Sequence, residues 1–572
     1  MAKKDYSNFD KKELIEEIKK LEKRKKYGLV WEDKPEKVAE MCKEKLPVLE
    51  EDKEKEIVTD KEKDYNILIE GDNYHALSVL NYTHKGKIDV IYIDPPYNTG
   101  NKTWTYNNQY IDEQDAFKHS KWISMMAKRL RLAKNLLKDK GILISAIDDY
   151  EVHNLRLLLD EIFNENNRLG TCVVVHNPGG RQDEKFFPTA HEYMLFYAKN
   201  ANLAEIGRLE IPDEKNQQYT YKDKFGRYKL REFRRSGSNS RRRDGPGLWY
   251  PIYYNKDTKE LTLEKKPGLI EIKPIDNKNI ERCWRWGKET FLRNKDKYIE
   301  VRKTKNGEYN LYVKEREEDN KGERAKTIWN KPRYSAVNGT NLIKNMFNET
   351  EKKIFDYPKS LFLMLDVLKI TAMKKDSIIL DFFAGSGTTG HAVLELNKED
   401  QGKRKVILCT NNEDNRGEGF NIAEKVCYPR LRKAIEGYTN LNGKKINGLG
   451  GNLKYFKTDF VDAKPTDSNK KKLVNKSTEM LCLREDCFNK IKEQDTFRVY
   501  TNNKGKLLGI IYNEEGLKPF KKELKKLNKK TVVYVFSLDD SAREEEFEDV
   551  KNLVDLKPIP EVILNVYRRI FK

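Results

Sequence analysis

The chain has 572 residues, and its 112 Lys and Arg residues outnumber its 92 Asp and Glu residues, giving a formal net charge of +20. At about 100–200 residues per domain, this length predicts about three or four domains. A hydrophobic fraction of 37% excludes a wholly disordered chain. No run approaches the ~20 apolar residues of a spanning helix, so we expect no membrane segment. The basic excess predicts a polyanionic partner, nucleic acid first, although a Lys-rich proteome would explain it equally well.

The N-terminus has no apolar core of a secretory signal, and the seven cysteines form no C-x-x-C pair. Both features favour reduced thiols and a cytoplasmic protein. In the first segment, residues 1–63, Leu14, Ile18 and Leu21 lie at helical spacing and predict a short amphipathic helix. The stretch Glu50–Lys63 is nearly all charged, which predicts a solvated linker.

Residues 64–200 predict an α/β sheet. Short apolar strands at 67–69, 89–93 and 141–145 alternate with helical patterns such as 117–137, which is typical of a parallel sheet buried on both faces. Residues 201–350 break this rhythm and are rich in Arg, Lys, Tyr, Trp and Gly.

The α/β pattern returns in residues 351–445, with helices at 361–371 and 390–396 and strands at 377–381 and 406–410. One sheet is therefore predicted to be encoded in two pieces, with an insert between them. Residues 446–572 predict a separate small α/β domain, with two strands around Asn502–Gly505 and a third at Val532–Ser537.

The most specific motif is Asp94-Pro95-Pro96-Tyr97, which directly follows the apolar strand residues Ile91–Ile93. Open α/β sheets bind ligands at the carboxyl ends of their strands. There the Asp94 carboxylate and the Pro95 carbonyl can each accept one N–H hydrogen bond from an exocyclic amino group. Tyr97 offers a face on which a planar base can stack. The alternative is an ordinary strand ended by prolines, with an exposed Tyr.

A second motif, Asp381-Phe382-Phe383-Ala384-Gly385-Ser386-Gly387, joins a strand to a glycine-rich turn and a helix. Residues 385–390 spell G-x-G-x-x-G, so a dinucleotide site is an alternative. Asp381 favours a ligand with an ammonium group, which a nicotinamide site does not need. The absence of a following Lys-Ser/Thr disfavours a P-loop, and Ala384 disfavours a serine-hydrolase elbow. His191-Glu192 begins an H-E-x-x-H motif, but Leu195 replaces the second His, so we predict no metal site.

Together these two motifs resemble those of the S-adenosylmethionine-dependent amino-methyltransferases of DNA, with a catalytic D-P-P-Y string and an F-x-G-x-G cofactor string. The catalytic motif precedes the cofactor motif, which is similar to the β group, whose insert is a target-recognition domain. D-P-P-Y is similar to the adenine-N6 members. The resemblance implies a circularly permuted Rossmann-like α/β sheet with an inserted target-recognition domain and a small C-terminal α/β domain.

Three further segments look like the modification subunits of type III restriction systems: Asp94–Gly100, Trp284–Glu289 and Pro558–Phe571. This resemblance covers most of the chain from about residue 65. It implies double-stranded DNA, a nuclease-helicase restriction subunit and a second copy of the chain as partners. Ser541–Val550 and Val562–Phe571 are the candidate docking surface.

The family implies roles for matching residues. Asp94, Pro95, Pro96 and Tyr97 would be catalytic. S-adenosyl-L-methionine would be bound by Asp381, Phe383, Ala384, Gly385, Ser386 and Gly387, its carboxylate by Lys359 and Ser360, and its adenine by Asp72. The strand at 406–410 lacks the usual acid that binds the ribose, which leaves Glu413 for that role. His191-Glu192-Tyr193 resembles a late motif near the target base, with a core strand as the alternative.

The resemblance implies direct transfer to an adenine flipped out of the duplex, without a cysteine nucleophile. Cytosine-N4 methylation, or a DNA-binding subunit that mainly docks a nuclease-helicase, are the alternatives.

The insert concentrates basic and aromatic residues that suit phosphates and bases. For any single Arg, phosphate contact or simple exposure is more common than base readout. The candidate DNA-binding residues are Arg234, Arg235, Arg241, Arg242, Arg243, Trp249 and Tyr250.

Overall fold

The computed structural model divides the chain into two compact units, Met1–Gly207 with Lys326–Lys572, and Arg208–Ala325. It describes residues 9–22, 31–106, 109–112, 114–180, 184–210, 217–304, 306–320, 322–348, 354–412, 421–538 and 541–571. None of the described helices is long and apolar enough to span a membrane.

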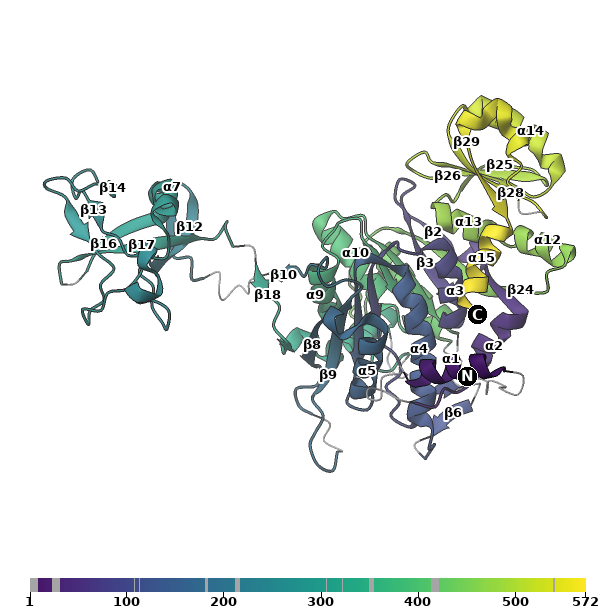
Figure 1. Cartoon of the computed structure of the whole chain (residues 1–572), viewed down its shortest axis with the longest axis horizontal. Helices are drawn as coiled ribbons and strands as arrows, with labels where there is room; N and C mark the ends of the chain where they lie inside the picture. The colour runs from purple at the N-terminus through teal and green to yellow at the C-terminus, as the bar shows by residue number, and fades with distance from the viewer. Residues whose placement is uncertain are drawn as a thin grey trace. The chain divides into compact units, whose positions relative to one another are not determined.

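A mixed sheet forms the centre of the first unit (Figure 1), and its central strands run in the order β3-β21-β20-β4-β7-β9-β8. All neighbours in this series are parallel except β9, which is antiparallel to both β7 and β8. These strands are β3 (Tyr65–Glu70), β4 (Ile88–Ile93), β7 (Leu137–Ile147), β8 (Arg168–Val175), β9 (His191–Ala198), β20 (Ile378–Asp381) and β21 (Lys405–Thr410). The two sequence pieces therefore share one sheet, with β20 and β21 from the later piece between β3 and β4 from the earlier one.

Helices cover this sheet in two packed groups. The connection from β20 to β21 moves along the sheet in the opposite direction from the connection between β3 and β4. Because such crossovers are right-handed, the two directions place their helices on opposite faces. One group holds α3 (Asn73–Thr83), α4 (Lys118–Leu136) and α5 (Val152–Phe163), and the other holds α9 (Leu361–Thr371), α10 (Thr388–Asp400) and α11 (Tyr428–Glu436).

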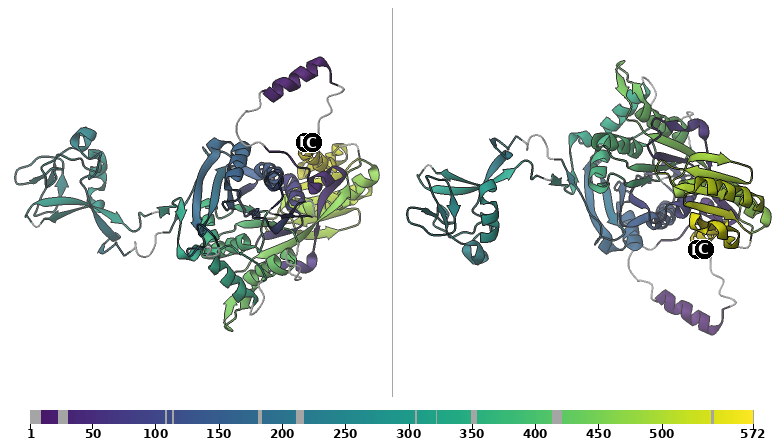
Figure 2. Two further views of the ribbon diagram at one scale, coloured as in Figure 1. Left: turned by 90° about the horizontal axis from the view of Figure 1, so that it is seen from below. Right: turned by 90° about the horizontal axis from the view of Figure 1, so that it is seen from above.

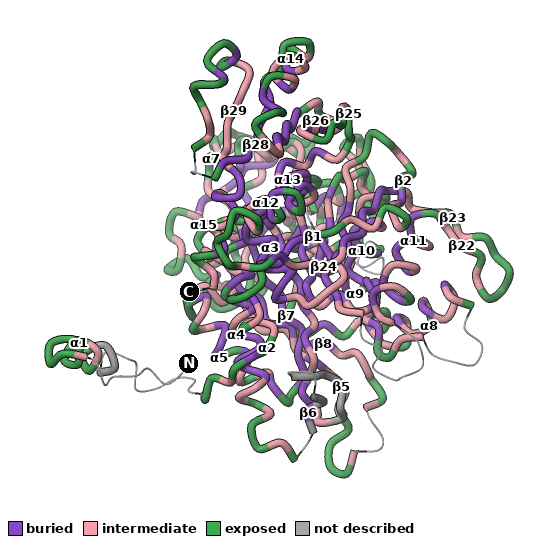
Figure 3. The backbone as a smooth tube through the Cα atoms, turned by 90° about the vertical axis from the view of Figure 1, so that its right-hand side faces the viewer, coloured by how far each residue is buried: buried purple, intermediate pink, exposed green. Residues whose placement is uncertain are grey.

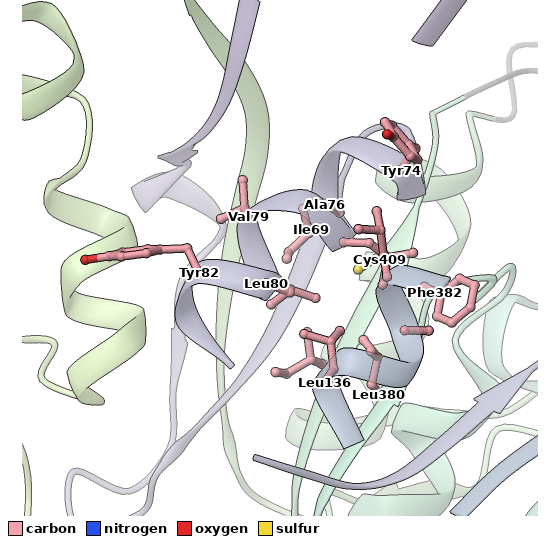
Figure 4. Packing of buried hydrophobic residues seen from close by; sticks show 14 of the residues in the cluster. Ile69, Tyr74, Ala76, Val79, Leu80, Tyr82, Leu136, Leu380, Phe382 and Cys409 are labelled. Atoms are coloured by element: carbon pink, nitrogen blue, oxygen red, sulfur yellow. The ribbon is translucent and has the colours of Figure 1, made fainter. Parts of the chain in front are cut away.

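Helix α3 is almost completely buried, since every residue from Tyr74 to Thr83 is buried. Figure 4 shows Val79 and Leu80 of α3 in one cluster with Ile69 of β3, Leu136 of α4 and Leu380 of β20. All five side chains are fully buried. Figure 3 shows the same concentration of buried residues along β7, β24 and α3. Elements that the sequence predicts on this side of the sheet, among them the strands at 67–69 and 89–93 and the helix at 117–137, thus share one core.

The N-terminal segment differs from its prediction. The expected helix is present as α1 (Lys11–Glu22), and Leu14 and Ile18 are exposed. The expected solvated linker at Glu50–Lys63 is wrong, because β1 (Lys45–Glu51) and β2 (Ile57–Val58) pair with β24 (Asn452–Asp462) and extend the sheet beyond β3. The buried Lys454 of β24 bonds Glu51 and Glu56, so charges that suggested solvent contact instead hold this edge.

The C-terminal part forms a second sheet, ordered β25-β26-β27-β28-β29, beside α14 (Leu517–Leu527) (Figure 1). Since β24 belongs to the main sheet, this small sheet begins later than residue 446. Leu508 and Tyr534 join the core of the main sheet, so the C-terminal part is an integral part of the first unit. Its other elements are β25 (Asn489–Glu493), β26 (Phe497–Thr501), β27 (Leu507–Ile511), β28 (Thr531–Phe536), β29 (Val554–Ile559), α12 (Asp467–Asn475), α13 (Thr478–Glu485) and α15 (Glu561–Ile570).

The second unit, teal in Figures 1 and 2, has its own core around Phe233, Trp284 and Phe291. The predicted insert, 201–350, is longer at both ends. Residues after Ala325 return to the first unit, where β19 (Ile328–Trp329) pairs with β8 and α8 (Ala336–Phe347) contacts α11. The strands of the second unit are antiparallel: β11 (Tyr221–Asp223), β12 (Gly226–Glu232), β17 (Tyr309–Arg316) and β16 (Ile299–Lys303) form one sheet, and β14 (Leu261–Thr262), β13 (Ile252–Tyr254) and β15 (Ile270–Ile272) another, with helix α7 (Lys288–Tyr298).

Short elements complete the fold. Strands β10 (Arg208–Leu209) and β18 (Glu323–Arg324) pair where the chain enters and leaves the second unit. The others are α2 (Lys37–Glu44), β5 (Asn101–Tyr106), β6 (Gln109–Asp112), β22 (Gly437–Thr439) and β23 (Lys445–Asn447).

The pairing of β1 with the main sheet predicts a stability effect. Leu49 is 1% exposed, so Leu49→Ala should lower the free energy of unfolding by about 2–4 kcal/mol through lost burial and a residual cavity. The adjacent exposed Glu50 gives the control, since Glu50→Ala should change it by less than about 0.5 kcal/mol. Scanning calorimetry measures both. Equal transition temperatures for the two variants would contradict the packed edge.

Candidate functional site

The two sequence motifs meet at the carboxyl ends of two central strands of the main sheet. Strands β20 and β4 are parallel neighbours, with Leu380 opposite Ile91. Their carboxyl ends therefore coincide, which brings Asp381 at the end of β20 near Asp94 just after β4. Motifs separated by about 290 residues in the chain thus form a single site.

The loop after β4 is fixed from two sides. The Trp122 indole of α4 donates a 2.7 Å hydrogen bond to the Pro96 carbonyl. Asn98 adopts a left-handed φ of 59° and donates to Glu151 Oε1 at 2.5 Å, while His119 Nδ1 lies 2.6 Å from the same oxygen. Since Trp122, Asn98 and Glu151 are fully buried, the loop has little freedom to move.

Two acceptors in this loop lack hydrogen bonds. Asp94 Oδ1 is buried, and no described residue makes a well-directed hydrogen bond to it, although Lys359 Nζ lies 3.3 Å away. The Pro95 carbonyl likewise accepts no hydrogen bond within the described part of the chain. Burial raises the pKa of Asp94, and the Lys359 ammonium opposes that rise. A buried acceptor without a donor is costly, so a ligand with two N–H donors suits this pair.

Tyr97 is held by its hydroxyl group. It donates a 2.9 Å hydrogen bond to Glu192 Oε2 on β9, and Lys359 Nζ bonds both the Tyr97 oxygen and Glu192 Oε2, the latter at 2.6 Å. The ammonium also lies 5.0 Å from the centroid of the Tyr97 ring. Burial and the nearby carboxylates raise the pKa of Tyr97, so the phenol keeps its proton.

The glycine-rich turn has the backbone that the sequence predicts. Gly385 and Gly387 adopt φ values of +48° and +79°, which disfavour larger residues. Asp381 is 2% exposed and accepts from the Phe383 N–H at 3.0 Å and the Thr389 hydroxyl at 2.6 Å. Burial raises the pKa of Asp381 to about 7, although both hydrogen bonds lower it. Its oxygens thus fix the turn.

A buried arginine on α11, which the sequence analysis did not identify, stabilises this turn. Arg430 of α11 is fully buried and donates to Ser386 Oγ at 2.9 Å and Thr388 Oγ1 at 2.7 Å. Because burial disfavours its charge, the pKa of Arg430 falls to about 10. Its surrounding sequence, Tyr428-Pro429-Arg430, gives no signal of this role.

The remaining predicted cofactor residues have partners within the protein. Asp72 caps α3 through the Tyr74 N–H and pairs with Arg129 at 3.1 Å, leaving its side chain 33% exposed. The Ser360 hydroxyl donates to the Arg333 carbonyl. Lys359 contacts Asp94 and Glu192, as above. Glu413 lies outside the described residues.

The predicted DNA-binding residues divide into exposed and engaged groups. Arg241, Arg242 and Arg243 are exposed, and the Arg242 guanidinium lies 4.0 Å above the half-buried Trp249 ring and pairs with Glu281. Tyr250 corrects its prediction: it is 2% exposed and its hydroxyl donates to the Trp286 carbonyl. A ring packed in the core of the second unit cannot stack on a base.

Arg234 and Arg235 lie beside that core. Arg234 bonds Glu232 and the Ile275 carbonyl, and Arg235 bonds the Cys283 carbonyl through its backbone. Among the described residues, no group of three or more His, Cys, Asp and Glu side chains is arranged to hold a metal ion.

Comparisons of the sequence with known proteins identify the family of this chain. A family model described as DNA methylase matches residues 88–427, which contain both motifs. The type II methyltransferase M.KpnI of Klebsiella pneumoniae is 38% identical over 384 residues, covering 66% of this chain and 89% of that protein. The type III restriction-modification enzyme EcoPI Mod subunit of Escherichia phage P1 is 32% identical over 397 residues, and the match spans 60% of its length.

Solved structures give weaker matches. The cytosine-N4-specific PvuII DNA methyltransferase is 12% identical, with 67% of this chain and 96% of that chain covered and a TM-score of 0.30. The M1.HpyAVI–SAM complex is 16% identical, with 64% and 98% covered and a TM-score of 0.27. Such scores support no conclusion about this chain. The sequence matches confirm the resemblance drawn from the two motifs, and the chain belongs to the DNA methylase family.

Proposed function

We propose that this DNA methyltransferase moves a methyl group from S-adenosyl-L-methionine to the N6 amino group of adenine in double-stranded DNA. The observation that carries the proposal is the pair of unsatisfied acceptors, Asp94 Oδ1 and the Pro95 carbonyl, beside the glycine-rich turn. An exocyclic amino group has the two N–H donors that this pair lacks. The aspartate of D-P-P-Y favours adenine, and cytosine-N4 is the alternative substrate atom.

S-adenosyl-L-methionine is the methyl donor of this family, and the glycine-rich turn fits it. A Cβ atom at Gly385 would lie 3.2 Å from the Phe355 ring, and one at Gly387 would lie 3.0 Å from Cys427 Sγ. Glycine at these two positions therefore lets the turn pack closely against Phe355 and Cys427, which fixes its course between β20 and α10. When bound, the donor supplies an electrophilic methyl group on a sulfonium.

The residues of the chain then act on the base. An amino group inside the duplex cannot reach the site, so the adenine must leave the stack. Asp94 and the Pro95 carbonyl accept its two N–H bonds and turn the nitrogen lone pair toward the methyl group. The Tyr97 ring packs against the base. Asp94, whose pKa burial raises, is placed to accept the proton that the nitrogen loses.

The strand order supports a circularly permuted sheet as part of this proposal. The strand of the catalytic motif precedes the strand of the cofactor motif in sequence, yet the two are neighbours. The second unit, Arg208–Ala325, would be the target-recognition domain, presenting Arg241, Arg242 and Arg243 to DNA.

We further propose that the chain serves as the modification subunit of a restriction-modification system in the cytoplasm, as a homodimer that docks a nuclease-helicase restriction subunit. The names of its relatives support this assignment, since they include several Mod subunits. A groove of about 910 Å³ beside α15 supports the docking role. Arg568, Arg569, Lys43 and Lys464 line it together with Leu564 and Phe571. It includes part of the predicted docking surface.

Replacing the catalytic carboxylate tests the reaction. Asp94→Ala removes one of the two acceptors, so methyl transfer should fall at least about 100-fold while binding of S-adenosyl-L-methionine stays within about twofold. Tritium incorporation and mass spectrometry of digested DNA measure rate and product. Asp139→Ala, at a mostly exposed carboxylate, should keep wild-type activity. N4-methylcytosine as the product would refute adenine specificity.

The turn predicts a cofactor effect with a matched control. Gly387→Ala places a Cβ against Cys427 at positive φ and should weaken binding of S-adenosyl-L-methionine about tenfold or more. Gly86 has a φ of +66° with no atom within 4 Å of a built Cβ, so Gly86→Ala carries a similar backbone cost away from the site. Equilibrium dialysis with labelled cofactor compares them. Equal affinities for the two variants would count against a cofactor at this turn.

The exposed arginines predict the salt dependence of DNA binding. Replacing Arg241 and Arg243 by Gln should weaken binding and reduce the slope of log K against log salt by up to about 0.9 per lost phosphate contact. The control changes the same charge at two exposed lysines of α14, Lys518→Gln and Lys522→Gln. Fluorescence anisotropy at several salt concentrations measures the slope. An unchanged slope in the arginine variant would refute the proposed DNA contact.

A further inference from the structure

A buried ammonium connects the D-P-P-Y loop after β4 to β9, which lies two strands away in the same sheet. Lys359, just before α9, has 15% of its side chain exposed and lies 3.3 Å from Asp94 Oδ1 and 2.6 Å from Glu192 Oε2. Among the described residues, its polar partners are Asp94, Glu192 and the Tyr97 hydroxyl. They come from the D-P-P-Y loop and β9, and none comes from the glycine-rich turn.

The charges of this cluster are already balanced against Lys359. Two carboxylates face one ammonium, and an ammonium this buried is stable because such partners surround it. A free anion, such as the carboxylate of an amino-acid ligand, would have to displace one of them. The predicted role of Lys359 in holding the cofactor's carboxylate therefore conflicts with its contacts.

The two carboxylates differ in their proton affinity. Lys359 and the hydrogen bond from Tyr97 hold the pKa of Glu192 below its usual range, so Glu192 is the stable anionic partner. Burial raises the pKa of Asp94, Lys359 lowers it, and Glu192 raises it. The groups that face the two carboxylates are Tyr92, Tyr97, Lys359, Asp381 and, beside Glu192, His176. Lys359 and Glu192 thus act on the ionisation of Asp94 in opposite directions.

The same pair fixes the Tyr97 ring. Glu192 accepts the proton of the phenol, and Lys359 donates to the phenol oxygen. With the hydroxyl held at both its donor and acceptor positions, rotation of the side chain would break two charge-assisted hydrogen bonds. A base-stacking ring needs such a fixed position, because a small displacement at a reacting centre costs rate.

We propose that Lys359 and Glu192 are positioning residues for the target base: together they hold the Tyr97 ring in place, Lys359 favours the ionised form of Asp94 against the opposing charge of Glu192, and Lys359 does not bind the cofactor. This inference rests on the proposed amino-methyl transfer. It gives roles to a lysine that the sequence placed on the cofactor and to a glutamate that the sequence left open.

Two substitutions with opposite effects on pH dependence test the proposal. Methyl transfer needs the Asp94 carboxylate, so its rate rises with pH as Asp94 loses its proton. Lys359→Met removes the cation and should move this acidic limb upward by about 1–3 pH units, so that raising the pH restores part of the lost activity. Glu192→Gln removes a like charge and should move the limb to lower pH. Both should lower the rate at neutral pH about tenfold or more, because Tyr97 loses an anchor.

The measurements are kcat against pH by tritium incorporation into unmethylated genomic DNA, and the Kd of S-adenosyl-L-methionine by equilibrium dialysis without DNA. In both variants the Kd should stay within about twofold of wild type. Lys369→Met, which removes an α9 lysine paired with Glu399, is the matched control and should leave both quantities unchanged.

Two outcomes would overturn the proposal. One is a cofactor Kd weakened about tenfold by Lys359→Met with an unmoved acidic limb, which would place Lys359 on the cofactor. The other is an acidic limb that stays fixed in Glu192→Gln, which keeps the shape of the side chain and carries the test if Lys359→Met fails to fold. The proposed function fails separately, if the wild-type chain transfers no methyl group or modifies cytosine.

Discussion

The parallel pairing of β20 with β4 is the contact on which the site depends. It aligns the carboxyl ends of two strands that lie about 290 residues apart in the chain, so a glycine-rich turn and a D-P-P-Y loop become neighbours. Neither motif forms the site by itself: the glycine-rich turn provides backbone without side chains, and the D-P-P-Y loop provides hydrogen-bond acceptors. The core around α3 keeps this register, because a shift by one residue would turn each side chain of the strand to the other face.

Several buried ionisable groups lie around that contact, and they differ in how far the protein itself supplies their hydrogen-bond partners. Asp381 is tied into its turn by two hydrogen bonds, and Arg430 supports the same turn without a carboxylate partner among the described residues. Asp94 keeps an unsatisfied oxygen and Lys359 near it. The Asp381 carboxylate accepts hydrogen bonds from within the protein, whereas Asp94 Oδ1 and the Pro95 carbonyl have no hydrogen-bond donor among the described residues. This contrast separates the scaffold of the site from its reactive part.

Much of this could be predicted from local sequence. The predicted strand at 377–381 and helix at 361–371 match β20 and α9 within one residue, because the apolar residues that bury these elements lie within the elements themselves. The motifs located the site for the same reason, since glycine at positive φ and proline after a strand have local causes. Family membership followed from those strings.

Long-range pairing set the features that local sequence could not show. The charges of 50–63 suggested solvent, yet Glu51 and Glu56 bond Lys454 some 400 residues later. Tyr250 follows a run of basic residues in the sequence, which suggested a base-stacking side chain, but it is buried in the core of the second unit. The contacts of Arg430 and of Lys359 depend on which helices and strands pack together, so no short sequence motif predicts them.

The paired strands β10 and β18 join the two units at a single stem, with Arg208 opposite Arg324. Because entry and exit lie side by side, the length of chain between them adds little loop-closure entropy to the first unit. The second unit also carries its own hydrophobic core. The second unit can therefore change in sequence, size or surface without disturbing the pairing of β4 with β20, which brings the two motifs together.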